Sequence, residues 1–282
     1  MRDTSVFQGS IIRRHRRMQI KNCAPPALST HSCLKNFLAL HDPFIFTKPF
    51  LKSQGGNVEL RFFEIYRNSE YLWFLFEGAC VSAGITMVSG SLGFLLALVL
   101  SGLRYFRTPV LSQISTGYVE FIRNTPLIVQ LFFVAFGLPM LLGYQWPFWA
   151  HALLGLTLNF SAYFSEILRA GFNTVDTGQK EAASALGIPK VIVFLKVVMP
   201  QSVARMFPSI NSQFIFLFLT TGVISEIGVR DLTQAGLFID SRTFRSFEVF
   251  ITLTGIYIVL SLGFKVGLSL LQRAVFKWQF LR

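Results

Sequence analysis

The stretch ACVSAGITMVSGSLGFLLALVL, residues 79–100, contains no charged side chain. A helix needs roughly 20 mostly apolar residues to cross the hydrocarbon core of a bilayer, so this run is long enough for one crossing. Small residues recur at every fourth position and share one helix face: Ser89, Gly93, Ala97 and Ser101. In lipid such a face lets helix backbones approach closely. We therefore expect a membrane-spanning helix over residues 71–103, whose small face serves either packing within the chain or contact with a second copy.

The composition extends this interpretation to the whole chain. Hydrophobic residues make up 52% of the sequence and charged residues 14%, whereas a soluble domain carries about 25% charged residues. Four further segments are long and apolar enough to span, at residues 127–142, 147–168, 207–227 and 249–271. The last contains a second pair of small residues four apart, Gly263 and Gly267. The sequence thus predicts an all-α membrane protein with about five transmembrane helices.

Several other functions lack their sequence signals. The net charge of +12 raises the question of nucleic acid, but the aromatic residues lie inside apolar runs and no nucleic-acid-binding motif is present. Three cysteines and four scattered histidines give no metal-ligand spacing. The Gly-x-x-x-x-Gly-Lys-Ser/Thr loop that cradles nucleotide phosphates is also absent from the sequence. We expect no cofactor, no metal, no nucleic-acid partner and no ATP hydrolysis by this chain itself.

The distribution of Lys and Arg predicts the orientation. Eleven of them follow the first and third segments or lie in the C-terminal tail, and three lie in the other two loops. In this count Arg123 belongs to the loop after the first segment. Because cytoplasmic loops are enriched in Lys and Arg, we expect the loop after the third segment and the C-terminus to be cytoplasmic.

The N-terminal extension, residues 1–66, does not fit this count. It is strongly basic, with a cluster at Arg13, Arg14, Arg16 and Arg17, yet five spans place it on the opposite side from the C-terminus. It contains neither a sixth span nor the apolar core of a signal peptide. Two accounts remain open: a poorly ordered tail, or a true start further downstream, for instance at Met18.

The loop after the third segment, residues 179–200, begins QKEAASALGIP. Glu181, Ala182 and Ala183 favour a short helix, which Gly187 can end. An amphipathic stretch over residues 190–198 follows, and we expect Met199-Pro200 to close it. A short charged helix with small side chains, held between two spans, suits a socket in another protein.

The same loop carries a family pattern. Glu181-Ala182-Ala183, Gly187 and Val197-x-Met199-Pro200 have the spacing of the Glu-Ala-Ala loop, which the permease subunits of binding-protein-dependent ABC importers share. Further stretches resemble the polar amino-acid permeases among them: residues 121–132, 162–171, 208–215 and 227–233. The resemblance covers roughly residues 67–282, and the preceding residues have no counterpart.

This resemblance implies a type I ABC importer permease domain in a bacterial inner membrane. Its coupling helix would dock into an ATP-binding cassette subunit through Glu181, Ala182, Ala183, Gly187 and Pro200. The other implied partners are a second permease copy, identical or not, a periplasmic solute-binding protein and the lipid bilayer. The solute would be a polar amino acid or a related small molecule.

One stretch departs from the family. Residues 219–223 read Leu-Thr-Thr-Gly-Val where a Lys-Asp pair is usual, which leaves the solute open. Polar residues inside the spans are candidates for the substrate pathway: Glu166, Tyr163, Asn159, Gln213, Thr220 and Thr221. The alternative for Glu166 is an ion pair with Arg169. For Asn159, Tyr163 and Gln213 the alternative is interhelical hydrogen bonding.

Two other functions stay open. A stand-alone ion-coupled transporter or channel would use Glu166 as a proton site. A membrane scaffold would recruit an ATPase without moving any solute. Copurification of an ATPase, ion-driven uptake by the isolated chain, or docking without flux distinguishes the three.

Overall fold

The computed structural model describes residues 62–277, which form helices and no strand. They belong to the second of two compact units, residues 60–282. Most of the N-terminal extension, including the arginine cluster and Met18, lies outside the described residues, as does Arg282.

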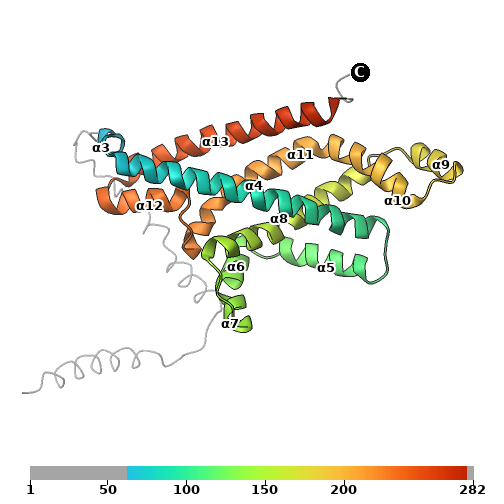
Figure 1. Ribbon diagram of the computed structural model, residues 1–282, viewed down its shortest axis with the longest axis horizontal. Coiled ribbons are helices and arrows are strands. Elements are labelled where there is room, and N and C mark those ends of the chain that lie inside the picture. Colours follow the sequence, from blue (N-terminus) through green and yellow to red (C-terminus); the bar gives the residue numbers. More distant parts are fainter. Residues whose placement is uncertain (1–61, 278–282) are drawn as a thin grey trace, which may run out of the picture. The chain divides into compact units, whose positions relative to one another are not determined.

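The first half of the described chain runs from a short leading helix to the third expected span (Figure 1). Its elements are α3 (Phe63–Arg67), α4 (Ser69–Tyr105), α5 (Leu111–Arg123), α6 (Leu127–Phe132), the π-helical η2 (Phe133–Gly137), α7 (Leu138–Leu142) and α8 (Phe148–Phe172).

The second half begins with the predicted docking loop and returns across the bundle twice. Its elements are α9 (Thr177–Ala185), α10 (Lys190–Val193), the π-helical η3 (Phe194–Val198), α11 (Met199–Thr220), the 3₁₀-helical η4 (Thr221–Ile227), α12 (Leu232–Thr243) and α13 (Ser246–Val275). α5 and α12 are helices in regions where the hydropathy pattern predicts loops.

Three helices of the described chain are long and apolar enough to cross a membrane: Ser69–Tyr105, Lys190–Ile227 and Ser246–Val275. A fourth crossing is present if α5 and the helices after it are counted as one broken span. The all-helical membrane fold is therefore confirmed. Two of the five expected spans, the second and the third, differ from regular apolar helices.

The third expected span, α8, is 25 residues long, but it is more polar than the three helices that are apolar enough to cross a membrane. It packs against α4, α5, α6 and α11, and its polar side chains Asn159, Ser161 and Ser165 are buried. A helix surrounded by other helices needs no apolar face toward lipid. The helix expected at residues 147–168 is therefore present, and its lower hydropathy reflects its place among other helices.

The second expected span, residues 127–142, does not continue in line with the helix before it. α5 and the segment Leu127–Leu142 meet at 109°. The Gln130 side chain holds this bend, because its Nε2 donates to Ile122 O at 2.8 Å and to Thr125 Oγ1 at 2.6 Å. Arg123 consequently lies at the C-terminal end of α5, which is helical, and not in a loop as the charge count assumed.

Prolines explain both π-helical segments. Each segment ends at the residue directly before a pair that ends in proline: η2 at Gly137, before Leu138-Pro139, and η3 at Val198, before Met199-Pro200. Proline lacks an N–H, and its ring clashes with the carbonyl four residues earlier. The N–H of the residue before the proline therefore donates to the carbonyl five residues earlier, and not four as in an α-helix. Met199 N–H accordingly donates to Phe194 O. The expectation that Met199-Pro200 closes the stretch 190–198 was wrong, because the helix continues as α11.

The small face of α4 packs inside the chain. Ser89, Ala97 and Ser101 are fully buried, and a Cβ on Gly93 would lie 3.2 Å from Thr157 O in α8. Gly263 in α13, by contrast, has nothing within 4 Å of such a Cβ. The first small-residue face therefore serves internal packing, and the pair in α13 is open in the single chain.

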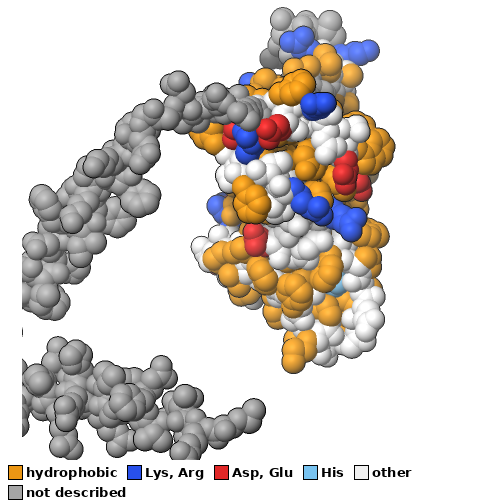
Figure 2. Space-filling model, turned by 90° about the vertical axis from the view of Figure 1, so that its left-hand side faces the viewer, with side chains coloured by type: hydrophobic (Ala, Val, Ile, Leu, Met, Phe, Trp, Pro, Cys, Tyr) orange, Lys and Arg blue, Asp and Glu red, His pale blue; other side chains and the backbone are white. Residues whose placement is uncertain are grey.

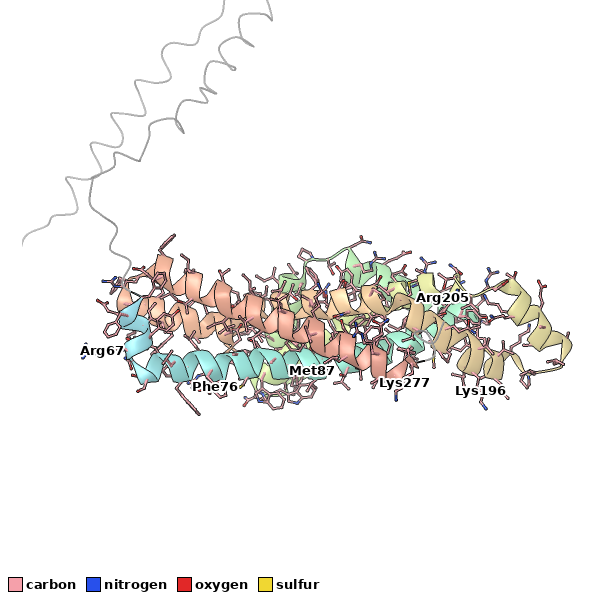
Figure 3. The ribbon with its side chains drawn as sticks, turned by 90° about the horizontal axis from the view of Figure 1, so that it is seen from above. Arg67, Phe76, Met87, Lys196, Arg205 and Lys277 are labelled. Atoms are coloured by element: carbon pink, nitrogen blue, oxygen red, sulfur yellow. The ribbon has the colours of Figure 1, made fainter. Side chains whose placement is uncertain are left out.

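The described bundle has two ends, named here the α12 end and the α9 end. Arg67 lies near the first, and Lys196 and Arg205 lie near the second (Figure 3). Along α4 the side chains of Phe76 and Met87 are exposed. The flanks of the bundle are thus apolar, as a lipid-facing surface requires.

Candidate functional site

The α9 segment, residues 177–188, is a short helix closed at both ends. Asp176 Oδ1 accepts a hydrogen bond from Gly178 N–H at 3.0 Å. At the other end Gly187 N–H donates to Ser184 O and Ile188 N–H to Ala183 O, which is the Schellman pattern. Gly187 has φ +72°, a left-handed conformation that glycine adopts without strain. The prediction that Gly187 ends this helix is confirmed.

Three contacts fix α9 to the spans on either side. Gln201 Nε2 donates to Gln179 Oε1 at 2.9 Å, joining the start of α9 to α11. Lys180 Nζ donates to Phe172 O at the end of α8 at 3.3 Å. Arg205 donates to Thr174 O, between α8 and α9. These contacts tie α9 to both α8 and α11.

A cluster of aromatic rings lies beneath α9. Tyr105 at the end of α4 contacts Phe172 of α8, with 5.6 Å between ring centroids, and Phe194 of η3, with 4.7 Å. Phe172 and Phe194 are 5.2 Å apart. Ala183, which is buried, belongs to the same hydrophobic core. The rings link the α9 segment to three spans.

The outward face of α9 is open. Glu181 and Ala182 are exposed, whereas Ala183 is buried, so these three of the five predicted docking residues divide between two faces. Leu186 is 78% exposed, although it is a large apolar side chain at the tip of the segment. The sequence analysis missed it. Its signal was a leucine directly before the helix-ending glycine, on a helix otherwise made of small and polar residues.

Pro200 has a different place from the other predicted docking residues. It lies where the continuous helix passes from η3 into α11, and it is half-buried. In the structure Pro200 shapes the helix path through η3 and does not belong to the exposed face of α9.

Glu166 lies at the centre of a charge cluster. Its carboxylate accepts from Arg104 of α4 at 2.5 Å and from Arg169 at 2.9 Å, and Arg123 of α5 approaches to 3.7 Å. The expected pair with Arg169 is present, and two further arginines join it. The side chain of Glu166 is 19% exposed. Its three partners tie α4, α5 and α8 together, and its role in a substrate pathway stays a prediction.

Tyr163 and Asn159 lie along the same side of α8 as Glu166. The Arg123 guanidinium carbon is 5.8 Å from the Tyr163 ring centroid. Asn159 is buried and donates from Nδ2 to Gln130 Oε1 at 2.8 Å. The interhelical hydrogen bond expected for Asn159 is therefore present, and it supports the bend after α5.

The three candidates from the fourth span separate from this group. Gln213 Nε2 is buried without a hydrogen-bond partner among the described residues. Thr220 is half-buried and bonds back to Leu217 O, and Thr221 is fully buried and bonds to Phe218 O. The altered stretch 219–223 lies where the α-helix tightens into η4. Gln213 and Thr220, seven residues apart, thus share one side of α11, while Thr221 faces the interior.

A buried carboxylate lies at the α12 end. Asp231 is fully buried, and its Oδ1 accepts from Gln234 N–H at 2.9 Å to cap α12. Burial raises the pKa of Asp231 to about 6, against its partly compensating hydrogen bonds. Oδ2 makes no regular hydrogen bond within the described part of the chain. The sequence analysis noted Asp231 only as part of a family pattern.

The described chain is thus a bundle of membrane helices with one short helix held at its end. The family model of the binding-protein-dependent transport system inner membrane component matches residues 89–277, and the chain belongs to this family. It is thus an inner-membrane protein, the membrane-spanning subunit of an ABC importer.

The relatives of known name are amino-acid permeases. The arginine transport system permease protein ArtQ of Bacillus subtilis (strain 168) is 38% identical over 190 residues, 67% of this chain and 86% of ArtQ. The probable glutamine ABC transporter permease protein GlnP of the same strain is 38% identical over 176 residues, 62% of this chain and 80% of GlnP. The predicted resemblance to amino-acid permeases is confirmed.

Solved structures agree. A crystal structure of an amino acid ABC transporter with histidines aligns at a TM-score of 0.67 and 32% identity, covering 75% of this chain and 98% of that one. The MetNI methionine ABC transporter in an inward-facing conformation aligns at 0.64 with 20% identity, covering 74% and 99%, which shows the shared fold alone.

Proposed function

We propose that this chain moves a polar amino acid across the inner membrane, driven by a separate ATP-hydrolysing subunit that docks on the α9 segment. A second permease copy and a periplasmic binding protein complete the transporter. The sequence of the chain contains no phosphate-binding loop, so the ATP must be bound elsewhere in the assembly.

The observation that carries this proposal is the construction of α9. One face is buried against the aromatic cluster through Ala183, and the other exposes Glu181, Ala182 and Leu186. Hydrogen bonds from Gln201 and Lys180 fix the segment to its neighbours. An element that is held on one side and exposes a large apolar side chain on its open side can receive a force from a partner and pass it on.

The orientation follows from the same charge argument as before. The α9 end carries Lys180, Lys190, Lys196 and Arg205, and three further basic residues, from Arg273 on, lie at the C-terminal end of the chain. Positive-inside placement puts this end, with the C-terminus, in the cytoplasm where ATP is available. The α12 end then faces the periplasm, where a binding protein delivers the solute.

The solute class rests on the relatives, whose names specify arginine and glutamine. Of the predicted pathway residues, Tyr163 and Glu166 line up on α8, and Gln213 and Thr220 share a face of α11. We propose that these two faces border the pathway. Glu166 also pairs with three arginines. It would therefore hold helices together in addition to any contact with a charged solute.

Gly187 gives the test of coupling. A valine at φ +72° costs roughly 1–2 kcal/mol, about a 5- to 30-fold change in the population of the intact terminus. A Cβ at this position has nothing within 4 Å, so the effect is conformational and not steric. We expect Gly187→Val to lose most ATP-dependent amino-acid uptake while the protein still inserts.

Gly187→Asn is the matched control, because asparagine tolerates the left-handed conformation far better than valine. It should keep most of the uptake. Normal uptake in Gly187→Val would refute the coupling role of α9. Ion-driven uptake by the chain without an ATPase would instead support the stand-alone transporter.

A further inference from the structure

A pocket of about 300 Å³ at the α9 end is lined by three basic side chains. Arg107 comes from the turn after α4, Lys180 from α9 and Lys190 from the start of α10. Among the described residues no acidic side chain lines this space, and the ion pairs include none of the three cations. Like charges around one space repel each other, so the pocket favours an anion.

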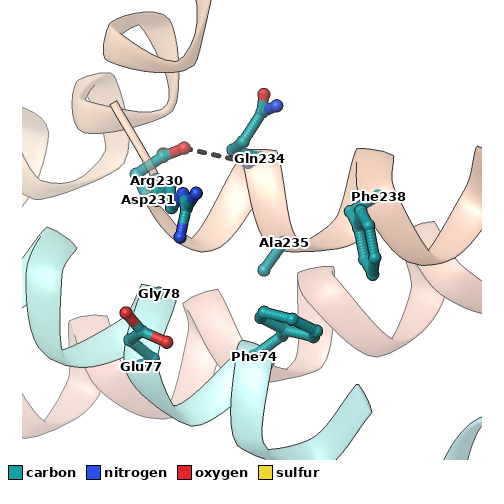
Figure 4. A pocket seen from close by; sticks show the side chains of 8 residues that line it. All are labelled: Phe74, Glu77, Gly78, Arg230, Asp231, Gln234, Ala235 and Phe238. Atoms are coloured by element: carbon teal, nitrogen blue, oxygen red, sulfur yellow. Dashed lines mark hydrogen bonds between the residues drawn. The ribbon is translucent and has the colours of Figure 1, made fainter. Parts of the chain in front are cut away.

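The charge of this pocket contrasts with that of a pocket at the other end of the bundle. There a space of about 200 Å³ between α4 and α12 is lined by both acidic and basic residues, Glu77 and Arg230 among them (Figure 4). The backbone before α12 lies directly on α4 at this point, because a Cβ on Gly78 would lie 2.7 Å from Asp231 O. Figure 2 shows acidic and basic side chains together on that end of the molecule. A surplus of positive charge therefore distinguishes the pocket beside α9.

The backbone at Arg107 is held in a conformation that arginine rarely adopts. Arg107 has φ +50°, and it follows α4 at the same position at which Gly187 follows α9. Its N–H donates to Arg104 O. Thr108 N–H donates to Leu103 O, which completes the same Schellman pattern as at the end of α9. Glycine adopts this left-handed conformation without strain, whereas arginine does not. The strain indicates that the arginine side chain has a role that glycine could not fulfil.

The pocket lies at the boundary of the membrane. The uncharged run of α4, residues 79–100, matches the hydrocarbon core in length, at ~1.5 Å per residue against a thickness of ~30 Å. The next seven residues include Tyr105, Phe106 and Arg107, which all line the pocket. Aromatic and basic side chains are typical of the interface with lipid headgroups. The pocket is therefore at the depth of the headgroups.

Exposed apolar side chains adjoin the pocket on two sides. Val110 lies three residues beyond Arg107, and Val191 and Ile192 directly follow Lys190. All three apolar side chains are exposed in the chain. Contact with water is unfavourable for them, and contact with acyl chains is not. A free phosphate ion would leave these side chains uncovered, whereas a phospholipid would cover them and neutralise the cations at the same time.

We propose that this pocket binds the phosphate of an anionic phospholipid, whose acyl chains cover the neighbouring apolar side chains. Lys180 Nζ donates to Phe172 O at 3.3 Å, and its ammonium keeps further N–H donors for the phosphate. The guanidinium of Arg107 can donate two parallel hydrogen bonds to phosphate oxygens. The exposed residues of α9 that we assign to docking do not line the pocket, so the lipid and the ATPase subunit can bind together.

The test titrates phosphatidylglycerol and phosphatidylcholine separately into the complete purified transporter and counts the bound lipids by native mass spectrometry. The wild type should bind phosphatidylglycerol more tightly, because the choline group of the other lipid adds a positive charge. Arg107→Gly and Lys190→Gln should each lower this preference about fivefold, as expected for one basic side chain near an anionic lipid surface. Lys196→Gln, on an exposed lysine of η3 that does not line the pocket, is the matched control and should keep the wild-type preference.

Arg107→Gly also separates binding from folding. Glycine relieves the strained backbone, so the melting temperature of the delipidated protein should be equal to that of the wild type or higher, while the lipid preference falls. If the melting temperature of this variant falls instead, Lys190→Gln decides, because it changes an exposed side chain and leaves the turn after α4 intact.

Pocket variants that keep the wild-type preference for phosphatidylglycerol would overturn the proposal. Displacement of the lipid by inorganic phosphate at similar concentrations would overturn it too, and would assign the pocket to a free anion. Loss of the ATP-hydrolysing subunit with an unchanged lipid preference would assign the cations to that partner and would equally overturn the lipid site.

ATP-dependent uptake, measured in parallel, keeps this proposal apart from the proposed function. Uptake by variants that have lost the lipid preference supports the lipid site and leaves the proposed function intact. Absence of ATP-dependent uptake in the wild type in every lipid mixture would refute the proposed function and leave the lipid site standing.

Discussion

The Asp231 side chain has several structural roles at the start of α12. It caps α12, lies under the backbone contact at Gly78, and keeps one oxygen without a regular hydrogen bond. Its pKa of about 6 means that the ionised form is disfavoured in the folded protein. The carboxylate therefore costs stability at neutral pH.

The pH dependence of the free energy of unfolding tests this cost. Because the folded pKa lies above the usual value of 3.8, stability from this group is complete below about pH 3.8 and is lost as pH rises through 6. Asp231→Asn should raise the free energy of unfolding by roughly 2–3 kcal/mol at pH 7.5, at about 1.4 kcal/mol per pKa unit. Near pH 3.5 it should have little effect.

The measurement is denaturant or thermal unfolding of wild type and Asp231→Asn at both pH values in one detergent. Other groups that titrate over this range do so in both proteins, so the difference isolates Asp231. An equal stability change at both pH values would contradict the assignment of a raised pKa.

Sequence patterns predicted some residues well. The helix stop at Gly187 needed only a glycine before Pro189, and the pair of Glu166 with Arg169 needed only their spacing. Arg104 and Arg123 were not predicted as partners of Glu166, because they come from other helices. The exposure of Leu186 likewise depends on how α9 is held.

At the scale of elements, local apolar content located α4, α8, α11 and α13 but did not identify α5 and α12 as helices. α8 is central and polar because other helices cover it. The 109° bend after α5 depends on the Gln130 side chain and its contact with Asn159, which hydropathy does not register. Contacts between helices therefore determine the polarity of α8 and the direction of the chain after α5.

The two small-residue faces give a prediction at this scale. Gly93→Ala would place a Cβ 3.2 Å from a backbone oxygen of α8, and such overpacking costs about 1–3 kcal/mol. The melting temperature in detergent should fall by roughly 2–4 °C for each kcal/mol. Gly263→Ala meets open space and should leave the single chain unaffected. Equal melting temperatures for the two variants would contradict the packing of α4 on α8.

At the scale of the whole molecule, the described chain carries different chemistry at its two ends. The α9 end presents a short helix with an exposed leucine, Leu186, among basic residues, and the α12 end presents a small pocket of mixed charge. The aromatic cluster around Tyr105, Phe172 and Phe194 connects the first of these to the spans. An importer needs this division, since ATP and solute approach from opposite sides.

Docking of an ATPase on α9 is the central claim, and Leu186 tests it most directly. Burying a leucine side chain contributes about 1.5–3 kcal/mol, so Leu186→Ser should weaken the complex roughly tenfold or more. Leu141→Ser, on a leucine that is 71% exposed in α7, is the matched control.

The measurement is the amount of ATP-hydrolysing subunit that copurifies with each variant from native membranes. We predict that the wild type and Leu141→Ser retain the subunit and that Leu186→Ser loses most of it while remaining folded. Undiminished copurification with Leu186→Ser would contradict docking at this site.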